Sequence, residues 1–201
     1  MEKRTYTAAS QTRQALAAAL KELMAQKPLD KITIRDLTER CGIRRQNFYY
    51  HFENVYDLMR WMFHEETLSL LEKHEGALLW QEGLLQLFYY LEENRAVCLC
   101  ALRSVGQDVL KQFFQSDIRA VIYRTVEQVG TEIGALAPGA PPVDTAMLTD
   151  FYTIALTGIV EGWLLGEIDR TPEQLIEFAG QLLQDQIRGA KLRLSADQCS
   201  L

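Results

Sequence analysis

Residues 33–52 read TIRDLTERCGIRRQNFYYHF. The first half has apolar residues at helical spacing up to Cys41, and Gly42 then interrupts the pattern. A second short helix, expected over residues 45–51, is rich in Arg, Gln, Asn and aromatic side chains. Two short helices joined by a tight turn form a helix-turn-helix, whose second helix lies in the DNA major groove. We therefore expect a helix-turn-helix in this segment.

The second of these helices opens with Arg44, Arg45, Gln46 and Asn47. Arginine pairs with guanine, and glutamine and asparagine pair with adenine, so the helix can read base edges. Arg44 occupies the N-cap position, where Ser, Thr, Asp or Asn are preferred and where a cation opposes the helix dipole. Bound phosphate groups would relieve that conflict. The pattern favours a DNA-facing helix, and the alternative is an exposed Arg pair that tolerates a weak cap.

Ring residues fill the second half of the same helix. Three positions have the spacing of core residues, namely Ile43, Phe48 and Phe52. Tyr49, Tyr50 and His51 then fall on or near the outer face, because three consecutive ring residues cannot all face inward on one turn. A core position for one of the two tyrosines remains open.

The sequence on both sides of this segment is typical of an all-α protein. No proline occurs between Pro28 and Pro138, so several helices can form without an internal breaker. One apolar stripe recurs at i, i+4 and i+7, at Leu16, Leu20 and Leu23. No stretch alternates with period two for long enough to indicate a sheet.

Capping residues and breakers predict the helix boundaries. The second helix begins after an N-cap at Thr33 and ends at Cys41-Gly42, and Asn54 caps the fourth, with Asp57 at the acidic position of a capping box. The other helices are expected over residues 10–26, 45–51, 54–75, 80–93, 95–104, 106–136, 144–166 and 172–193. Residues 137–142 predict a loop, and the tail from Ser195 is expected to fray.

The composition indicates a soluble globular protein. Of 201 residues, 48% are hydrophobic and 24% charged, which excludes disordered, collagen-like and disulfide-scaffold chains. Four cysteines and a polar stretch over residues 1–15 predict a cytoplasmic location. The most apolar run, residues 151–166, carries Glu161 and is too short for a membrane span.

The charge is unevenly distributed along the chain. Residues 1–60 contain 11 Lys and Arg against 7 Asp and Glu, whereas residues 61–201 contain 10 against 20. A basic N-terminal part on an acidic body indicates that one end meets a polyanion.

The segment from Leu16 to Leu58, with ITIRDLTERCGIRRQNFYYHF at its centre, resembles the DNA-binding domain of the TetR family of bacterial transcription regulators. The shared pattern is apolar-Thr-apolar-Arg-Asp-apolar, then Gly, then a short helix that ends in aromatic-Tyr-x-His-Phe. The resemblance implies an all-helical homodimer that binds double-stranded DNA. It places a three-helix head in residues 1–53 and a helical effector-binding and dimerisation domain in residues 54–201.

The resemblance also implies roles for single residues. Phosphate contacts are implied for Thr33, Asn47, Tyr50 and His51, and base contacts for Arg35, Arg45, Gln46 and Tyr49. The chain departs from the family at two positions. Arg44 stands where many members have a small or hydroxyl N-cap, although it belongs to the same DNA-facing set. Val55 stands where many members have a lysine that binds the DNA backbone, which implies weaker unaided binding.

The C-terminal part is similar, more loosely, to regulators of dihydroxyacetone kinase operons. The similarity is carried by NFYYHFENVYDLMRWMF and GIVEGWLLGEIDRTPEQL, with Trp163 and a helix start at Thr171-Pro172-Glu173. Some members of that branch are co-activators that work with a separate sensor protein.

From the TetR resemblance we predict a ligand-responsive repressor acting as a homodimer on a palindromic operator. The alternative is a co-activator or adaptor that works through a partner sensor protein.

The family resemblance makes the last two long helices the dimer interface. Gly158, Gly162 and Gly166 recur there every four residues, and each costs roughly 1 kcal/mol in a helix interior relative to Ala. That cost favours a packing role, in which they permit close helix approach within or between subunits.

The same resemblance implies an effector cavity within residues 60–165, for an unknown small molecule. Candidate lining residues are Trp61, Phe88, Tyr89, Tyr90, Phe113, Phe114, Tyr123, Tyr152 and Trp163, although aromatic residues at helical spacing more often form the core.

The sequence predicts no enzyme and no cofactor. His64 and His74 are ten residues apart, and Cys98 and Cys100 are separated by one residue, so neither pair has common zinc-ligand spacing. The chain contains no glycine-rich phosphate loop and no nucleophile elbow. Both cysteines are expected to be small apolar packing residues.

Overall fold

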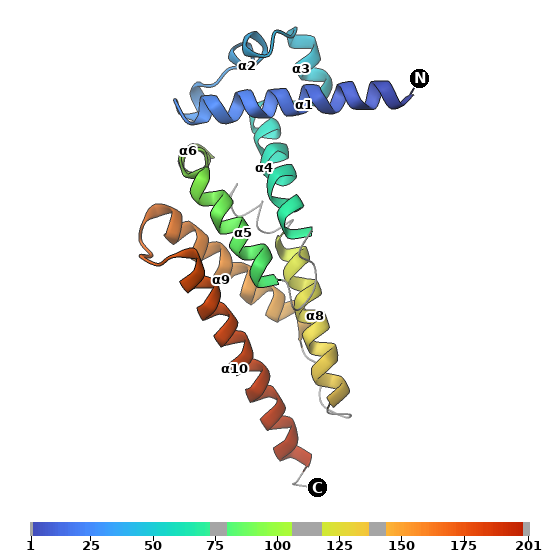
Figure 1. Cartoon of the computed structure of the whole chain (residues 1–201), viewed down its shortest axis with the longest axis vertical. Coiled ribbons are helices and arrows are strands. Elements are labelled where there is room, and N and C mark those ends of the chain that lie inside the picture. Colours follow the sequence, from blue (N-terminus) through green and yellow to red (C-terminus); the bar gives the residue numbers. More distant parts are fainter. Residues whose placement is uncertain (1, 73–79, 106–117, 137–143, 199–201) are drawn as a thin grey trace. The chain divides into compact units, whose positions relative to one another are not determined.

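The computed structural model describes residues 2–72, 80–105, 118–136 and 144–198, and in these ranges all regular structure is helical (Figure 1). The elements are α1 (Glu2–Met24), the short 3-10 helix η1 (Leu29–Lys31), α2 (Ile34–Arg40), α3 (Arg45–His51), α4 (Val55–Glu72), α5 (Trp80–Glu93), α6 (Arg95–Val105), α8 (Arg119–Leu136), α9 (Thr145–Leu165) and α10 (Pro172–Gln198). The all-α prediction is confirmed.

Most helix boundaries lie close to their predicted positions, and the two chain ends differ most. Helix α1 begins at Glu2 rather than at residue 10, because neither Gly nor Pro interrupts the polar residues that precede the apolar stripe. Helix α10 continues to Gln198, beyond its predicted end at residue 193, and the fraying expected from Ser195 stays a prediction. The first part of the helix predicted over 106–136 and the loop at 137–142 lie outside the described residues.

The chain divides into two compact units. Unit 1 comprises residues 1–68 and 94–113, and unit 2 comprises residues 69–93 and 114–201. The first four helices therefore share a unit with α6, which follows them in sequence only after α5. The predicted domain boundary between residues 53 and 54, which separates the DNA-binding head from the effector-binding domain, stays a prediction.

The core of unit 1 joins α1, α2, α3, α4 and α6. Its fully buried side chains include Leu16, Leu20, Leu37, Phe48 and Leu58, as the periodicity on α1 predicted. Lys21 on α1 pairs with Glu66 on α4 at 2.5 Å. The backbone N–H of Leu29 donates to the hydroxyl of Ser104 on α6 at 3.2 Å. These two contacts attach α4 to α1 and α6 to η1, the two elements that precede the helix-turn-helix.

Unit 2 contains two pairs of packed helices, α8 with α9 and α5 with α10. Trp163 is buried at the end of α9, where its indole N–H donates to the carbonyl of Arg170 at 3.0 Å and its ring packs edge-on against Phe88. Helix α10 begins at Pro172, as predicted, after a cap in which Thr171 and Gln174 bond to each other's backbone N–H.

Within one chain, Gly158, Gly162 and Gly166 do not share one close helix contact, and their close approach between subunits stays a prediction. Gly166 lies beyond the helix, where its φ of +80° ends α9 in the left-handed conformation. A methyl group on Gly162 would meet Ile168 of the following turn at 3.1 Å, and one on Gly158 would meet nothing within 4 Å. Each glycine therefore has its own environment.

No helix in the described ranges combines the length and the apolar character that crossing a bilayer requires.

Candidate nucleic-acid interface

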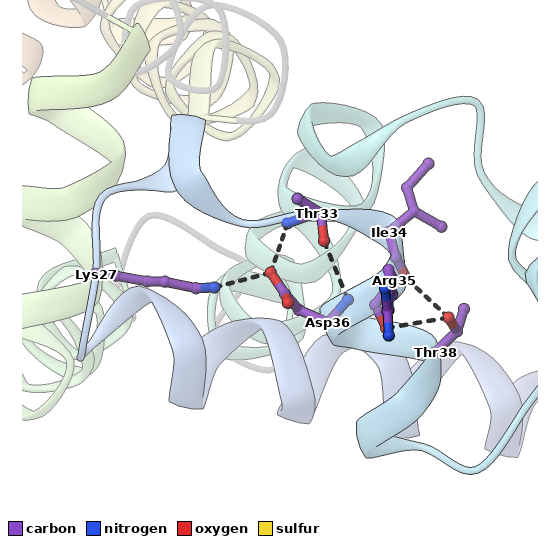
Figure 2. Close-up of polar contacts among 6 residues, drawn as sticks. All are labelled: Lys27, Thr33, Ile34, Arg35, Asp36 and Thr38. Atoms are coloured by element: carbon purple, nitrogen blue, oxygen red, sulfur yellow. Dashed lines mark hydrogen bonds and ion pairs between the residues drawn. The ribbon is translucent and has the colours of Figure 1, made fainter.

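The start of α2 is held by a complete capping box (Figure 2). The Thr33 hydroxyl accepts from the backbone N–H of Asp36 at 3.2 Å, and the Asp36 carboxylate accepts from the N–H of Thr33 at 2.9 Å. Lys27 also donates to that carboxylate, at 2.8 Å. These bonds lower the pKa of Asp36 to about 2, the one from Lys27 most of all. The predicted N-cap at Thr33 is confirmed, and its hydroxyl proton remains available to a phosphate.

Helix α3 is positioned by the turn before it and by the single apolar side of the helix. Gly42 has a φ of +65°, which allows the tight turn between α2 and α3. Phe48 is fully buried and Phe52 is nearly so, while Ile43 packs against the same core. The predicted core positions are confirmed, and they direct the remaining face of α3 outward.

That outward face carries the side chains predicted to read bases. Arg45, Gln46 and Asn47 are exposed, as is Arg44, which occupies the N-cap without a side-chain capping bond. In the part of the chain that the structure describes, the side chains of Arg44, Arg45 and Gln46 make no hydrogen bond or ion pair. They are free to bond an external acceptor.

The two tyrosines of α3 both lie on the surface. Tyr49 is 60% exposed and Tyr50 is 82% exposed, so neither takes the core position that the sequence left open. His51 is half-buried, and its ring stacks edge-on against Tyr50. Burial lowers the pKa of His51, and the positive charge of Arg13 lowers it further. Near neutral pH, His51 can therefore donate a hydrogen bond without carrying a charge.

Arg35, the base-reading candidate on α2, is already engaged. Its Nε donates to the Glu39 carboxylate at 2.6 Å, an i, i+4 pair that raises the pKa of Arg35. Arg35 and Glu39 stand four residues apart in the sequence, which is the spacing of such a helical ion pair. This pair occupies the Nε of Arg35, whereas the Arg45 side chain makes no such bond among the described residues.

The start of α4 explains one departure from the family pattern. The Asn54 side chain accepts from the N–H of Asp57 at 2.9 Å, as predicted, but the Asp57 carboxylate bonds the N–H of Glu53 rather than that of Asn54. Val55 is 8% exposed and belongs to the core of unit 1. The position thus serves packing rather than contact with a phosphate.

A second candidate site is a cavity of about 890 Å³ within unit 2. It is lined by α5, α8, α9 and α10, and therefore reaches beyond the range 60–165 expected from the sequence. Of the aromatic candidates that the structure describes, only Tyr152 lines it. The sequence missed Trp80, Phe151 and Phe178, because apolar spacing on a helix is the same for a core and for a cavity wall.

The other aromatic candidates have different surroundings. Phe88 and Trp163 form the packed core described above, and Trp61 packs against the core of unit 1. The Tyr89 hydroxyl donates to Glu173 at 2.6 Å and so joins α5 to α10. Phe113 and Phe114 lie outside the described residues.

The two cysteines of α6, Cys98 and Cys100, lie in packed surroundings. Burial raises the pKa of the Cys98 thiol to about 12, which makes it a poor nucleophile. Cys100 is half-buried, and its thiol donates to the carbonyl of Lys27 at 3.5 Å. Among the described residues, no group of three or more His, Cys, Asp or Glu is arranged to hold a metal ion.

Comparison with known proteins agrees with this geometry. Residues 16–60 match the model of bacterial regulatory proteins of the tetR family, and residues 79–185 match a transcriptional regulator C-terminal region. A solved structure of a dihydroxyacetone kinase operon activator, DhaS, superimposes with a TM-score of 0.67. It covers 88% of this chain and 96% of that chain at 23% identity, which shows the shared fold.

Two curated relatives match part of the chain. The HTH-type dhaKLM operon transcriptional activator DhaS of Lactococcus lactis subsp. lactis is 34% identical over 84 residues, which is 42% of this chain and 45% of that protein. The probable acrEF/envCD operon repressor of Escherichia coli K12 is 32% identical over 89 residues, or 43% of this chain and 40% of that protein. The matched stretches thus span less than half of either relative, and both are transcriptional regulators rather than enzymes by name. With its helix-turn-helix and its C-terminal region both matched, the chain belongs to the TetR family of DNA-binding bacterial transcriptional regulators.

Proposed function

We propose that this chain binds a palindromic DNA operator as a homodimer and reads its sequence mainly through α3. The observation that carries the proposal is the unpartnered polar face of that helix. Arg45 and Gln46 lie exposed without protein partners, and Tyr49 lies beside them, 60% exposed. A side chain without a protein partner can bond a base without breaking a contact within the protein, whereas Arg35 has its Nε and part of its orientation fixed by Glu39.

The remaining candidates take positioning roles on the DNA backbone. The Thr33 hydroxyl, Asn47, Tyr50 and His51 bond phosphates, and Arg44 adds positive charge at the start of α3. Such contacts fix the register of a protein on DNA without reading its sequence. They also make binding depend strongly on salt concentration.

The apolar faces of α9 and α10 support the homodimer. Met147, Phe151 and Ile154 recur at i, i+4 and i+7 on α9, and each is more than half exposed. On α10, Phe178 is 60% exposed and Leu182 is 40% exposed. Exposed apolar stripes on neighbouring elements mark interaction surfaces, and an isologous contact would use the same stripes on both subunits.

For the sign of regulation, we propose repression relieved by a small molecule that fills the cavity of unit 2. Ligand would favour a spacing of the two heads that no longer matches successive major grooves, so the dimer would leave the operator.

A second candidate function is transcriptional activation, with a partner sensor protein. Two observations favour it. Val55 is buried where many family members place a phosphate-binding lysine, and the relative that is 34% identical over 84 residues is named a transcriptional activator.

Fluorescence anisotropy of the purified protein on DNA from upstream of its own gene tests the proposal. Titrations at about 50 and about 200 mM salt should show a steep loss of affinity if several phosphates are contacted. Random DNA, added as competitor, should displace the labelled upstream DNA from the protein only weakly. If a folded dimer binds the upstream DNA no more tightly than random DNA, autonomous operator recognition is contradicted and the second candidate function is supported. A reporter fused to the same upstream DNA gives the sign of regulation, since loss of a repressor raises expression.

A further inference from the structure

Arg13, in the middle of α1, carries a charge without a partner among the described residues. Its side chain is half-buried, and its Nε is buried without any hydrogen bond. The guanidinium makes no ion pair and no hydrogen bond with another described residue. Buried polar groups of folded proteins nearly always have a partner, so this charge indicates a ligand from outside the chain.

The elements around Arg13 supply no acid that neutralises it. Residues 9–17, which cover one helical turn on each side of Arg13, contain no Asp or Glu, and α3 contains none either. On α4, the Asp57 carboxylate already accepts from the N–H of Glu53 at 3.1 Å and from Arg60 at 3.4 Å. Within the described ranges, the positive charge of Arg13 is thus left uncompensated.

Ring contacts hold the guanidinium and lead from it to the end of α3. Its Cζ lies 5.4 Å from the ring centroid of Trp61 on α4, which is a cation–π contact. The rings of Trp61 and Phe52 have centroids 5.6 Å apart, and those of Phe52 and His51 are 6.3 Å apart. Burial lowers the pKa of His51, and the charge of Arg13 lowers it further, as expected for near neighbours. Arg13 therefore lies near the residue of α3 that is proposed to bond a phosphate.

We propose that Arg13 bonds a phosphate group of the DNA backbone beside His51, and that Trp61 orients it for this contact. The inference rests on the DNA binding of the proposed function and deepens it, because it adds a residue of α1 to a surface built from α2 and α3. Since Nε is buried, the two terminal nitrogens of the guanidinium make the contact. Their N–H groups can bond two oxygens of one phosphate.

The stacking on Trp61 determines what this contact contributes. A guanidinium that already lies against a ring loses little freedom when a ligand arrives, so the arrangement favours affinity. Arg13 lies on α1, outside the helix that is proposed to read bases, and contacts to phosphate carry no sequence information directly. Arg13 should therefore strengthen binding to upstream DNA and to random DNA alike.

Arg13→Gln tests the contact, with the parent and the variant titrated on both DNAs over a range of salt concentrations. The affinity for both DNAs should fall by a similar factor, at least about tenfold at about 100 mM salt. The slope of log affinity against log salt concentration should become shallower by about 0.9 for each bound subunit, the value of one phosphate contact. An unchanged slope, or a loss confined to the upstream DNA, would overturn the proposal.

Control variants separate the contact from general effects of charge and stability. Arg103→Gln removes an exposed charge from α6 of the same unit and should leave the slope unchanged. Arg13→Lys keeps a cation and should restore the slope of the parent. Circular dichroism shows whether each variant is folded, and Arg13→Met, which keeps an unbranched stem, replaces Arg13→Gln if that variant does not fold. An equal change of slope in Arg103→Gln, or a shallow slope in Arg13→Lys, would overturn the proposal.

A double-mutant cycle tests the orienting role of Trp61. Trp61→Leu should weaken binding to both DNAs. The double variant with Arg13→Gln should bind no more weakly than Arg13→Gln alone, because Trp61 acts on DNA only through Arg13. Losses that add in the double variant would overturn the orienting role.

Inorganic phosphate distinguishes the DNA backbone from a free anion. The melting temperature of the parent in phosphate should equal that in chloride of the same ionic strength. A higher value in phosphate that is lost in Arg13→Gln, together with an unchanged slope for DNA, would assign the site to free phosphate and overturn the backbone contact.

The two DNAs also separate this inference from the proposed function. A parent that prefers no sequence, but whose slope on random DNA depends on Arg13, would contradict operator recognition and leave the phosphate contact standing. Specific binding of upstream DNA with the same slope in parent and Arg13→Gln would do the reverse. A parent that binds neither DNA would overturn both.

Discussion

The two units of the molecule expose different kinds of large side chain. Among the described residues, the large apolar side chains exposed in unit 1 are all tyrosines, namely Tyr49, Tyr50 and Tyr56. Those exposed in unit 2 are mainly aliphatic or phenyl groups, such as Met147, Ile154 and Phe178. Tyrosine keeps a hydroxyl for polar partners, whereas phenyl and aliphatic groups gain only from leaving water.

Interior packing differs in the same direction. The core of unit 1 contains many side chains with no exposure, while unit 2 encloses a cavity of about 890 Å³. A filled core holds a reading surface in one geometry, and a cavity leaves room for a ligand to change the structure around it. The two units thus differ in how completely their side chains fill the interior.

The largest effect is expected from matched leucine truncations in the two units. Leu58→Ala removes a fully buried side chain from unit 1 and should lower the free energy of unfolding by about 2–5 kcal/mol. Leu156→Ala removes a half-buried side chain that faces the cavity, and should cost less than about 1.5 kcal/mol. Urea unfolding followed by circular dichroism, at one protein concentration, measures both. Equal losses would mean that the two interiors are packed alike.

Base reading by α3 gives the next largest effect. Arg45→Ala should weaken discrimination at one position of each half-site by about 1–3 kcal/mol, because an unpartnered guanidinium bonds a base there. Competition titrations with single-base operator variants report this loss. Arg103→Ala, an exposed arginine of α6 in the same unit, serves as the matched control and should leave the preference unchanged. If the Arg45→Ala variant shows the same order of affinities for all operator variants as the parent, base reading by Arg45 on α3 is contradicted.

The capping box of α2 predicts a dependence of stability on pH. Asp36 has a folded-state pKa of about 2, below its ordinary 3.8, so its ionised form stabilises the folded chain fully above about pH 4. This contribution is lost as the pH falls from about 4 towards 2. Asp36→Asn should therefore be less stable than the parent at pH 7, and the gap in melting temperature should shrink in acid. Asp30→Asn is the control, and a gap that stays constant with pH would contradict the assignment.

The smallest effect concerns His51 on the DNA backbone. Its pKa is lowered in the free protein by burial and by Arg13, and a nearby phosphate would raise that pKa again. Binding should then take up a proton, so affinity should increase modestly from pH 8 to pH 6. Anisotropy titrations across this range should show a flatter profile for His51→Gln than for the parent, with His64→Gln as the control. Parallel profiles for parent and His51→Gln would place His51 away from phosphate.

Local signals predicted the helix-turn-helix well. The cap at Thr33, the glycine at position 42 and the buried Phe48 each act through neighbours a few residues away, so sequence spacing was sufficient to locate α2, the turn and α3. The pair between Arg35 and Glu39 is equally local, because the two residues lie one helical turn apart. Helix α1 began before its predicted start because amphipathic periodicity marks the packed part of a helix rather than its full length.

The cavity could not be predicted in the same way. Trp80, Phe151 and Phe178 come from three helices, and their spacing is that of any buried helix face. Whether such residues fill a core or leave a space depends on how far apart the helices pack. That distance is set by side chains on every helix of unit 2 together.

The sequence by itself determined the all-α class, the helix-turn-helix and the polar side chains that open α3, because hydrogen bonding and capping within a helix are short-range. Only the tertiary structure decided that Val55 is a core residue, that the Nε of Arg35 is already paired, and that residues of α5, α8, α9 and α10 line a common cavity. These properties depend on contacts between side chains distant in sequence, whose free energies are set by packing and burial rather than by local spacing.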